Sequence, residues 1–381
     1  MPNDFIEMPE LKIGNLKLKK PVIQGGMGVG ISMSKLASAV ANEGGIGVIS
    51  SVGLGLLDEI PNTSFKKGNK ERLAKEIHKA RSLTNGVLGL NIMVAVSDYN
   101  ELVTLAFDEE IDIIFLGAGL PLKLPEDITV ERLKNGVTRI AVIVSSARAV
   151  KLIFQTWQKK FDHLPDMVVV EGPMAGGHLG FKKEQIFDPA YALENLLPEV
   201  LSVVSGFESA AGKKIPVIAA GGIYNGADIF RILQMGVQGV QMGTRFVATN
   251  ECDASQAFKQ AYINCKKEDI TIIESPVGLP GRAIRNKFIN EVSGGGRKPF
   301  QCPWKCLKTC NFREAPYCIA KALTNAQKGN VEEGYTFAGA NAFRIKEIIP
   351  VKELFNELDK EYNRAVLKFQ SDREATDKIA I

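Results

Sequence analysis

Eight short apolar runs, most of them followed by a more polar segment, recur along the first two thirds of the chain. Each run has six to eight residues, is rich in β-branched side chains and mostly lacks an alternation of apolar and polar positions. Such runs are typical of parallel strands that are covered on both faces. The runs occupy residues 21–26, 46–51, 87–94, 111–117, 139–145, 167–172, 216–222 and 239–246.

The segments between these runs have the composition and end signals of helices. Residues 34–44 open on Ser34, a predicted helix cap, and close on Gly44. Residues 69–83 and 145–157 predict helices in the same way. Eight strand–helix units within about 250 residues are the number of a closed barrel. The sequence therefore predicts an α/β protein with a (β/α)8 TIM barrel.

An open doubly wound sheet is the alternative fold, and its nucleotide-binding motif would follow the first strand. Residues 24–30 are rich in glycine, but Ile31 and Met33 occupy the positions where G-x-G-x-x-G needs its last glycine. No acidic residue closes the second strand either. The barrel is therefore the better prediction.

The pattern changes in the last third of the chain. Residues 275–286 are rich in turn-forming residues, and residues 294–300 have the composition of a flexible connector. Residues 351–370 predict a helix that packs on the barrel. We therefore predict a barrel over residues 1–269 and an appended C-terminal subdomain over residues 270–381.

Composition and charge exclude several classes of function. The net charge of +4 over 381 residues is small, and no basic stripe carries interleaved aromatic side chains, so no nucleic-acid partner is expected. The apolar runs are too short to cross a membrane, and the first residues lack the apolar core of a signal peptide. Six cysteines without an export signal predict a cytoplasmic protein in which disulfides are not expected. No feature indicates an oligomeric state.

Glycines follow the last two predicted strands, where barrels commonly bind phosphate. Gly221 and Gly222 end one strand, and Gly243 and Thr244 end the next. Glycine lets the backbone approach a ligand and present its N–H groups. These four residues therefore predict a phosphate site, with tight turns between strand and helix as the alternative role of the glycines.

One of the three histidines lies at a predicted strand end. His178 belongs to the glycine-rich segment EGPMAGGHLG (171–180), whereas His78 and His163 lie in polar segments expected at the surface. An imidazole can accept or give a proton near neutral pH. His178 is therefore the predicted catalytic base, and a structural histidine that holds its loop is the alternative.

Polar or flexible residues also end the first and third predicted strands. Asn91 interrupts an apolar run, so its side chain must be hydrogen-bonded, either to a heterocycle at the barrel mouth or to neighbouring backbone. Gln24, Gly25, Gly26 and Met27 end the first strand and present backbone groups at the same mouth. They suit an isoalloxazine ring, or form a plain turn.

Several of these motifs, in this order, resemble the nitronate monooxygenase family, formerly called 2-nitropropane dioxygenases, and the related flavin-dependent enoyl-ACP reductases. The resemblance covers roughly residues 9–290. Two departures stand out: Gly25-Gly26-Met27 replaces the usual Ala-Pro-Met, and residues 143–148 lack a lysine that some members carry. The motifs are PVIQGGM (21–27), GLNIMV (89–94), EGPMAGGHLG (171–180), IPVIAAGGI (215–223), VQMGTRF (240–246) and SPVGLPGRAIRN (275–286).

The resemblance implies FMN as the cofactor and His178 as the catalytic base. It places the phosphate at the four residues of the last two strand ends and the flavin ring near the first and third strand ends. Glu171, Gly176 and Gly177, which belong to the same segment as His178, are also expected at the cofactor.

Two flavin reactions follow from this resemblance, and a third possibility uses no flavin. In the first, His178 takes the α-proton of a nitroalkane, or orients a nitronate, and O₂ reoxidises the flavin. In the second, NAD(P)H as co-substrate reduces FMN, which reduces an enoyl thioester or a quinone. In the third, the barrel binds a phosphate compound without flavin. The chain has no separate dinucleotide motif, which favours the first.

Four of the six cysteines fall within 17 residues. If this segment is a helix with Pro303 at its first position, three of the four thiols share one face. Together with the fourth they predict an iron–sulfur cluster or zinc, and packing of small buried thiols is the alternative. These residues are Cys302, Cys306, Cys310 and Cys318.

Overall fold

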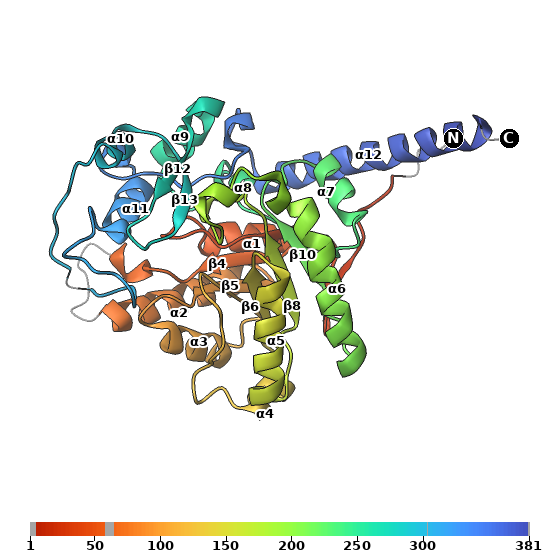
Figure 1. Cartoon of the computed structure of the whole chain (residues 1–381), viewed down its shortest axis with the longest axis horizontal. Coiled ribbons are helices and arrows are strands. Elements are labelled where there is room, and N and C mark those ends of the chain that lie inside the picture. The colour runs from red at the N-terminus through yellow and green to blue at the C-terminus, as the bar shows by residue number, and fades with distance from the viewer. Residues whose placement is uncertain (1–4, 58–64, 303, 380–381) are drawn as a thin grey trace.

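The computed structural model describes residues 5–57, 65–302 and 304–379 (Figure 1). All eight predicted runs form strands of one parallel sheet, in the order β3-β11-β10-β8-β7-β6-β5-β4. A parallel bridge between Ile23 and Ile46 joins the two outer strands of this order and closes the sheet. The predicted (β/α)8 barrel is therefore confirmed. Its strands are β3 (Val22–Gln24), β4 (Gly47–Ser50), β5 (Leu88–Met93), β6 (Ile113–Gly117), β7 (Arg139–Val144), β8 (Met167–Glu171), β10 (Val217–Ala220) and β11 (Gly239–Met242).

Helices surround the barrel, and the three helices predicted between the early strands are present as α1, α2 and α5. The strands are apolar on both faces because one face packs against these helices and the other fills the barrel. The helices between and just after the strands are α1 (Ser34–Asn42), α2 (Phe65–Leu83), α3 (Tyr99–Asp108), α4 (Val130–Asn135), α5 (Ala147–Phe161), α6 (Leu193–Ala211), α7 (Gly226–Leu233), α8 (Thr244–Val247) and α9 (Gln256–Asn264).

The inside of the barrel is a packed core. Ile23, Val48, Phe115, Val169 and Ile218 belong to one buried cluster, which is distinct from the larger cluster between strands and helices. An N-terminal hairpin of β1 (Leu11–Ile13) and β2 (Leu16–Leu18) packs its apolar residues against this inner cluster. The hairpin therefore closes one end of the barrel.

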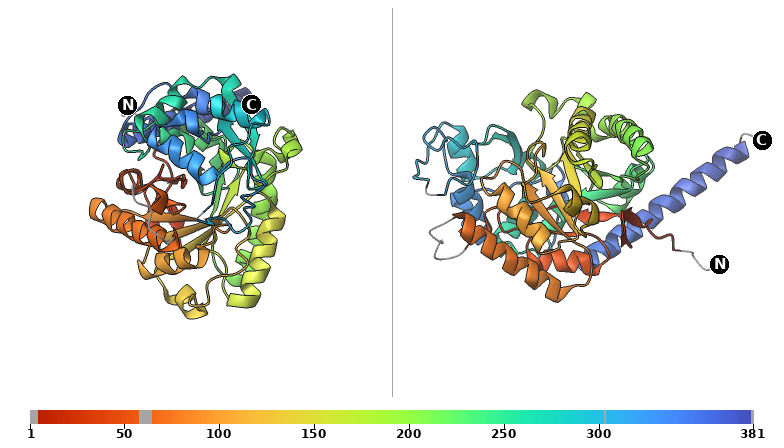
Figure 2. Two further views of the ribbon diagram at one scale, coloured as in Figure 1. Left: turned by 90° about the vertical axis from the view of Figure 1, so that its left-hand side faces the viewer. Right: turned by 90° about the horizontal axis from the view of Figure 1, so that it is seen from below.

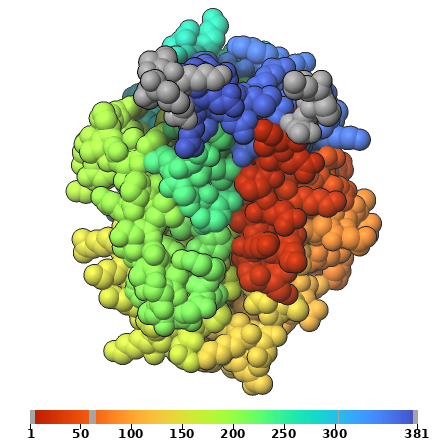
Figure 3. Space-filling model, turned by 90° about the vertical axis from the view of Figure 1, so that its right-hand side faces the viewer, coloured from red at the N-terminus to blue at the C-terminus, as the bar shows by residue number. Residues whose placement is uncertain are grey.

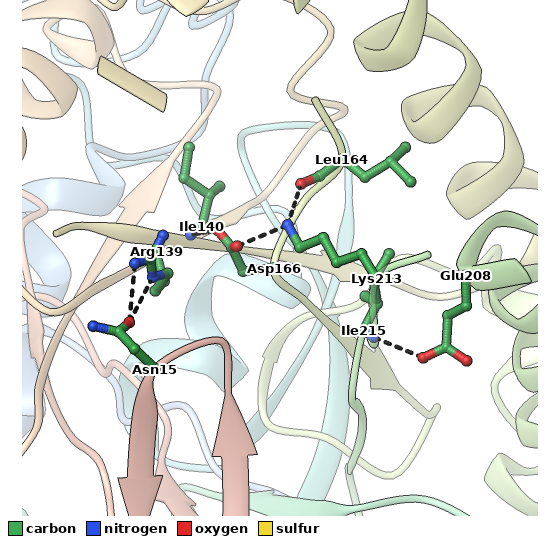
Figure 4. A network of polar contacts seen from close by, with 8 residues as sticks. All are labelled: Asn15, Arg139, Ile140, Leu164, Asp166, Glu208, Lys213 and Ile215. Atoms are coloured by element: carbon green, nitrogen blue, oxygen red, sulfur yellow. Dashed lines mark hydrogen bonds and ion pairs between the residues drawn. The ribbon is translucent and has the colours of Figure 1, made fainter. Parts of the chain in front are cut away.

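A polar network stabilises the end of the barrel where the strands begin (Figure 4). Arg139, the first residue of β7, donates to Asn15 Oδ1 at 2.9 Å in the loop of the hairpin. Asp166 accepts from the Ile140 amide at 2.8 Å and from Lys213 Nζ at 2.8 Å. Residues at the face where the strands begin usually contribute to stability, whereas active sites of such barrels lie at the face where the strands end.

The chain after the barrel strands builds a smaller sheet with its own core. β12 (Ile270–Glu274) pairs with β13 (Pro280–Ile284), which pairs with β9 (Gly177–His178) from the loop after β8. Phe288, Tyr317 and Tyr335 form the centre of a small apolar cluster there. The helices α10 (Lys287–Ser293) and α11 (Ile319–Lys328) lie beside this sheet in Figure 1.

The last helix, α12 (Val351–Ile379), returns to the barrel and packs against α7 and α1. Leu354, Phe355 and Leu358 are buried in this contact, so the predicted packing of the final helix is confirmed. The end of α12 projects from the body of the molecule (Figure 2). The N-terminal segment lies beside α12 (Figure 3), and the Ile6 amide donates to Asn363 Oδ1 in the middle of this helix at 2.9 Å. The division of the chain at residue 269 stays a prediction.

Two local predictions were wrong. Ser34 does not cap α1; the Asp253 carboxylate accepts from the Met33 and Leu36 amides instead, and a cap from a distant segment leaves no local signal. The described cysteines of the four-cysteine segment are not on a helix, and Pro303 lies outside the described residues. The backbone there pairs with another loop, since the Ser97 amide donates to the Cys306 carbonyl at 3.0 Å.

None of the helices within the described ranges combines the length and the apolar character that crossing a membrane requires.

Candidate active site

Three polar side chains point into the barrel at the ends of their strands. Successive strand side chains point to opposite faces, and Glu171 is two residues beyond Val169 of the inner core. Asn91 is two residues beyond Gly89, whose missing Cβ would lie 2.7 Å from the Phe115 ring. Gln241 likewise follows Gly239, which abuts the inner core. The mouth of the barrel therefore has a polar floor.

These floor side chains are available for a ligand. The side-chain amides of Asn91 and Gln241 and the side-chain carboxyl of Glu171 make no hydrogen bond with any part of the chain that the structure describes. The Ser50 hydroxyl, which is buried nearby at the end of β4, also has no partner there. Burial raises the pKa of Glu171 to about 7. Polar groups buried without a partner cost free energy, so the floor is suited to a polar, planar ligand.

In the segment that ends β3, Gln24 has a structural role, whereas Gly25 and Gly26 lie beside the polar floor. Gln24 is fully buried, and its Oε1 accepts from the Val48 amide at 3.0 Å, so its side chain joins the barrel at the β3–β4 seam. A Cβ at Gly26 would lie 2.3 Å from Asn91 Cβ, and one at Gly25 would lie 3.3 Å from the Gln241 side chain. The two glycines therefore leave room above the floor.

Two of the glycines predicted for phosphate, Gly221 and Gly222, adopt conformations that favour glycine. Gly221 has φ +92° and Gly222 has φ +87°, and a Cβ at Gly221 would lie 2.7 Å from the Gly172 carbonyl. The backbone N–H groups of Gly221, Gly222, Gly243 and Thr244 find no acceptor among the described residues. Free N–H groups at the ends of β10 and β11 form a cradle that fits a phosphate.

His178 is held away from the barrel wall by the smaller sheet. It pairs with Gly281 of β13, while Gly177 before it has φ +78°, so a glycine is required at this turn. His178 Nε2 lies 2.7 Å from Ser275 Oγ, and the Phe337 ring packs edge-on at 5.0 Å. Burial lowers the pKa of His178 to about 4, so the imidazole is neutral near pH 7.

Arg282 fixes the loop that carries His178. Its guanidinium is buried and donates to the carbonyls of Pro173 and Ala175, the second at 2.7 Å. A buried guanidinium holds two carbonyls at once because its N–H groups form a rigid fork. The position of His178 therefore depends on β13 as well as on β8.

A segment that was not predicted for the site covers the phosphate cradle. The Gly339 amide donates to Thr244 Oγ1 at 3.1 Å, and Asn341 Nδ2 donates to the Gly222 carbonyl at 2.7 Å. A Cβ at Gly176 would lie 2.6 Å from the backbone at Ala338, so the two loops touch directly. The closely spaced small residues around Gly339 are the only sequence signal that indicates such an approach.

The structure therefore brings most of the predicted site residues to one end of the barrel. Asn91, Glu171, His178 and the four cradle residues belong to loops or strand ends of this mouth. The four cysteines form a separate group beside the loop after β5. Ser275 and Phe337 contact His178 but were not predicted as site residues.

A parallel barrel with an imidazole, free backbone N–H groups and polar side chains at its mouth is an arrangement that a flavin-dependent oxidoreductase can use. The family model for nitronate monooxygenase matches residues 9–112 and 95–361. The chain belongs to the nitronate monooxygenase family and is an oxidoreductase. This membership supports FMN as its cofactor.

Two curated relatives differ in the activity that their names give. A Staphylococcus aureus protein named probable nitronate monooxygenase is 29% identical over 373 residues, covering 89% of this chain and 96% of that protein. A Mycobacterium tuberculosis protein named (3aS,4S,5R,7aS)-5-hydroxy-7a-methyl-1-oxo-octahydro-1H-indene-4-carboxyl-CoA dehydrogenase is 29% identical over 280 residues, covering 74% of this chain and 67% of that protein.

Solved structures share the fold. FabK from Thermotoga maritima superimposes with a TM-score of 0.72 at 26% identity, covering 93% of this chain and 96% of that one. Nitroalkane oxidase from Streptomyces ansochromogenes has a TM-score of 0.70 at 21% identity, covering 92% and 98%, and so indicates the fold alone.

Proposed function

We propose that the protein is an FMN-dependent nitronate monooxygenase that oxidises alkyl nitronates with O₂. The observation that carries this proposal is the half-buried, neutral imidazole of His178, which forms a hydrogen bond with Ser275 at the mouth of the barrel. A neutral imidazole can accept the acidic α-proton of a nitroalkane, whereas a protonated one cannot. The cytoplasmic location stays a prediction from composition.

The residues present fit FMN. Gly221, Gly222, Gly243 and Thr244 would hold its phosphate, because their N–H groups are free and a side chain would fill the cradle. The flavin ring would be held by Asn91, Glu171 and Gln241 of the floor and by the backbone from Gly25 to Met27. Gly176 and Gly177 would leave room for the cofactor beside His178. When bound, FMN supplies the oxidation chemistry and passes electrons to O₂.

The protein's own part in the reaction is positioning and proton transfer. His178 Nε2 and Ser275 Oγ form a hydrogen bond of 2.7 Å. In the proposed reaction Nε2–H donates to Ser275, so that Nδ1 has the free lone pair that accepts a proton. The α-carbon of a nitroalkane gives its proton to Nδ1, and the nitronate anion remains beside the imidazolium. Phe337 packs against the ring and excludes water from one side of it.

A reductase that uses NAD(P)H and acts on an enoyl thioester or a quinone is the second candidate. It is favoured by the Mycobacterium tuberculosis relative, which is named as a dehydrogenase of a CoA thioester. It is also favoured by the fold likeness to FabK at 26% identity. In this reaction His178 would give a proton to the product instead of taking one from the substrate.

Anaerobic reduction of the bound flavin separates the two candidates. The flavin absorbance is followed after addition of a preformed alkyl nitronate, NADH or NADPH, each in a separate sample. We expect rapid bleaching by the nitronate and slow bleaching by both nucleotides. Rapid bleaching by NADH or NADPH, with none by the nitronate, would overturn the proposed function in favour of the reductase.

A further inference from the structure

The four cysteines that follow the smaller sheet surround a cavity outside the barrel mouth. From this arrangement we infer that the protein binds a [4Fe–4S] cluster between Cys302, Cys306, Cys310 and Cys318. This inference goes beyond the proposed function, because it concerns a second metal-containing site and holds for either candidate reaction.

The cavity has the lining that an iron–sulfur cluster needs. Its volume is about 340 Å³, and all four cysteines contribute to its wall. Phe300, Phe312 and Ile319 make much of the remaining wall apolar. Thiolates that hold such a cluster require an apolar shell, since solvent access controls its stability and potential.

The spacing of the thiols suits a cluster better than a single ion. A single zinc ion needs four ligand atoms that converge to about 2.3 Å from one point. Within the described ranges, no three His, Cys, Asp or Glu side chains converge in this way. The four thiols are arranged around a space of several atomic volumes instead. Transfer of a preformed [4Fe–4S] cluster from a thiolate-bound carrier breaks the carrier's four Fe–S bonds and forms four Fe–S bonds to this chain. The four thiol protons pass to the carrier's thiolates, and no oxidation state changes.

Charge at the cavity agrees with this ligand. The four inorganic sulfides and four thiolates together outweigh the positive charge of the four iron ions, so a cluster of this type is anionic overall. Lys305 and Lys308 both line the cavity, and none of the described residues in its wall is acidic. Lys308 Nζ also donates to the Val94 carbonyl at 2.8 Å, which keeps its charge beside the segment.

The site links parts of the chain that are distant in sequence. The Ser97 amide donates to the Cys306 carbonyl, and the Lys308 amide donates to the Ala95 carbonyl, both at 3.0 Å. These bonds fix the cysteine segment to the loop after β5, the strand that carries Asn91 of the floor. Cys318 directly precedes α11, so one cluster would tie this loop to α11.

The remaining two cysteines provide a matched control. Cys265 is also buried, but its thiol donates to the Lys266 carbonyl at 3.3 Å and lies outside the cavity. Cys306→Ala and Cys265→Ala each remove one thiol, the first from a half-buried and the second from a buried position. Only the first change removes a ligand of the inferred cluster.

The test is metal and sulfide analysis of the whole protein purified without oxygen. We expect about four iron atoms and four acid-labile sulfides per chain, and a paramagnetic resonance signal after reduction with dithionite. Cys306→Ala should lower iron and sulfide to less than a quarter of these values, whereas Cys265→Ala should retain them.

Several results would overturn the inference. Zinc without sulfide, neither metal nor sulfide, or the same iron content in wild type and Cys306→Ala would each do so. If Cys306→Ala does not fold, exposure of the wild-type protein to air provides a second measurement. Iron and sulfide should then be lost in parallel while the FMN content stays constant; iron that remains after the sulfide is gone would contradict a cluster.

Discussion

The substitution Gly222→Ala tests whether the glycines after β10 hold a phosphate or only form a turn. Gly222 has φ +87°, which costs an alanine about 1–2 kcal/mol. The added Cβ would lie 3.0 Å from both Cβ and Sδ of Met174; the Sδ end can rotate away, because this side chain is 44% exposed, but Met174 Cβ can move only with its backbone. The backbone conformation and this close contact therefore act in the same direction.

Turning the backbone to relieve this strain redirects the Gly222 N–H away from the cradle. A hydrogen bond to a charged group contributes about 1.5–3 kcal/mol, so the Kd for FMN should rise about 10- to 100-fold. Riboflavin has the same ring but no phosphate, so its Kd should stay within about a factor of two or three of wild type.

Titration of the flavin-free protein, followed by flavin fluorescence, measures both constants. Gly206→Ala is the control, because its Cβ would meet nothing within 4 Å on α6, and its affinities should match wild type. An equal loss of FMN and riboflavin affinity in Gly222→Ala would refute the phosphate role and leave this glycine as a turn residue.

Three further substitutions test the base, the floor and the opposite barrel end. His178→Asn should keep FMN and lose about 10²–10⁴-fold in turnover of neutral nitroalkanes, with smaller losses for preformed nitronates; equal losses in a steady-state assay would make His178 structural. The pKa of His178 is about 4 in the fold, below its unfolded value, so its contribution to stability is complete above about pH 6.5 and is lost as the pH falls toward 4. An acidic limb of kcat/KM at or above about pH 6.5 would contradict this shift. The pKa of Glu171 is raised to about 7, so its ionisation destabilises the fold as the pH rises through 7. Glu171→Gln should therefore raise the Tm of the flavin-free protein at pH 8 but not at pH 5. Equal Tm changes at both pH values would contradict the raised pKa. Asp166→Ala removes the side-chain acceptor of the Ile140 amide and one of the two acceptors of Lys213, and should cost about 2–3 kcal/mol in urea unfolding; a loss of kcat in the folded variant would show that this network also acts on the site.

The barrel could be predicted from the sequence because each strand carries its own local signal. A parallel strand buried on both faces must be apolar along its whole length, and the eight runs show this individually. The glycine-dependent turn after β10 could be predicted for a related reason, since a pair of glycines at a strand end indicates a backbone conformation that other residues rarely adopt; its role in binding a phosphate stays a prediction. The contacts of His178 could not be predicted: Ser275 is 97 residues away, and no periodicity or spacing encodes that pairing. The cap of α1 could not be predicted for the same reason, because Asp253 lies 220 residues from Met33 in the sequence.

The division of labour within the site bears on substrate choice. The barrel supplies the floor and the cradle, which would hold the same cofactor whatever the substrate. The position of His178 depends instead on β13, Arg282 and Ser275, all from the part of the chain beyond residue 269. A fold can support several reactions when the site residues are placed by variable segments on a constant scaffold. Relatives at 29% identity carry names as different as a nitronate monooxygenase and a CoA-thioester dehydrogenase. We therefore expect residues 270–343, and not the barrel strands, to determine whether a nitroalkane or a thioester reaches His178.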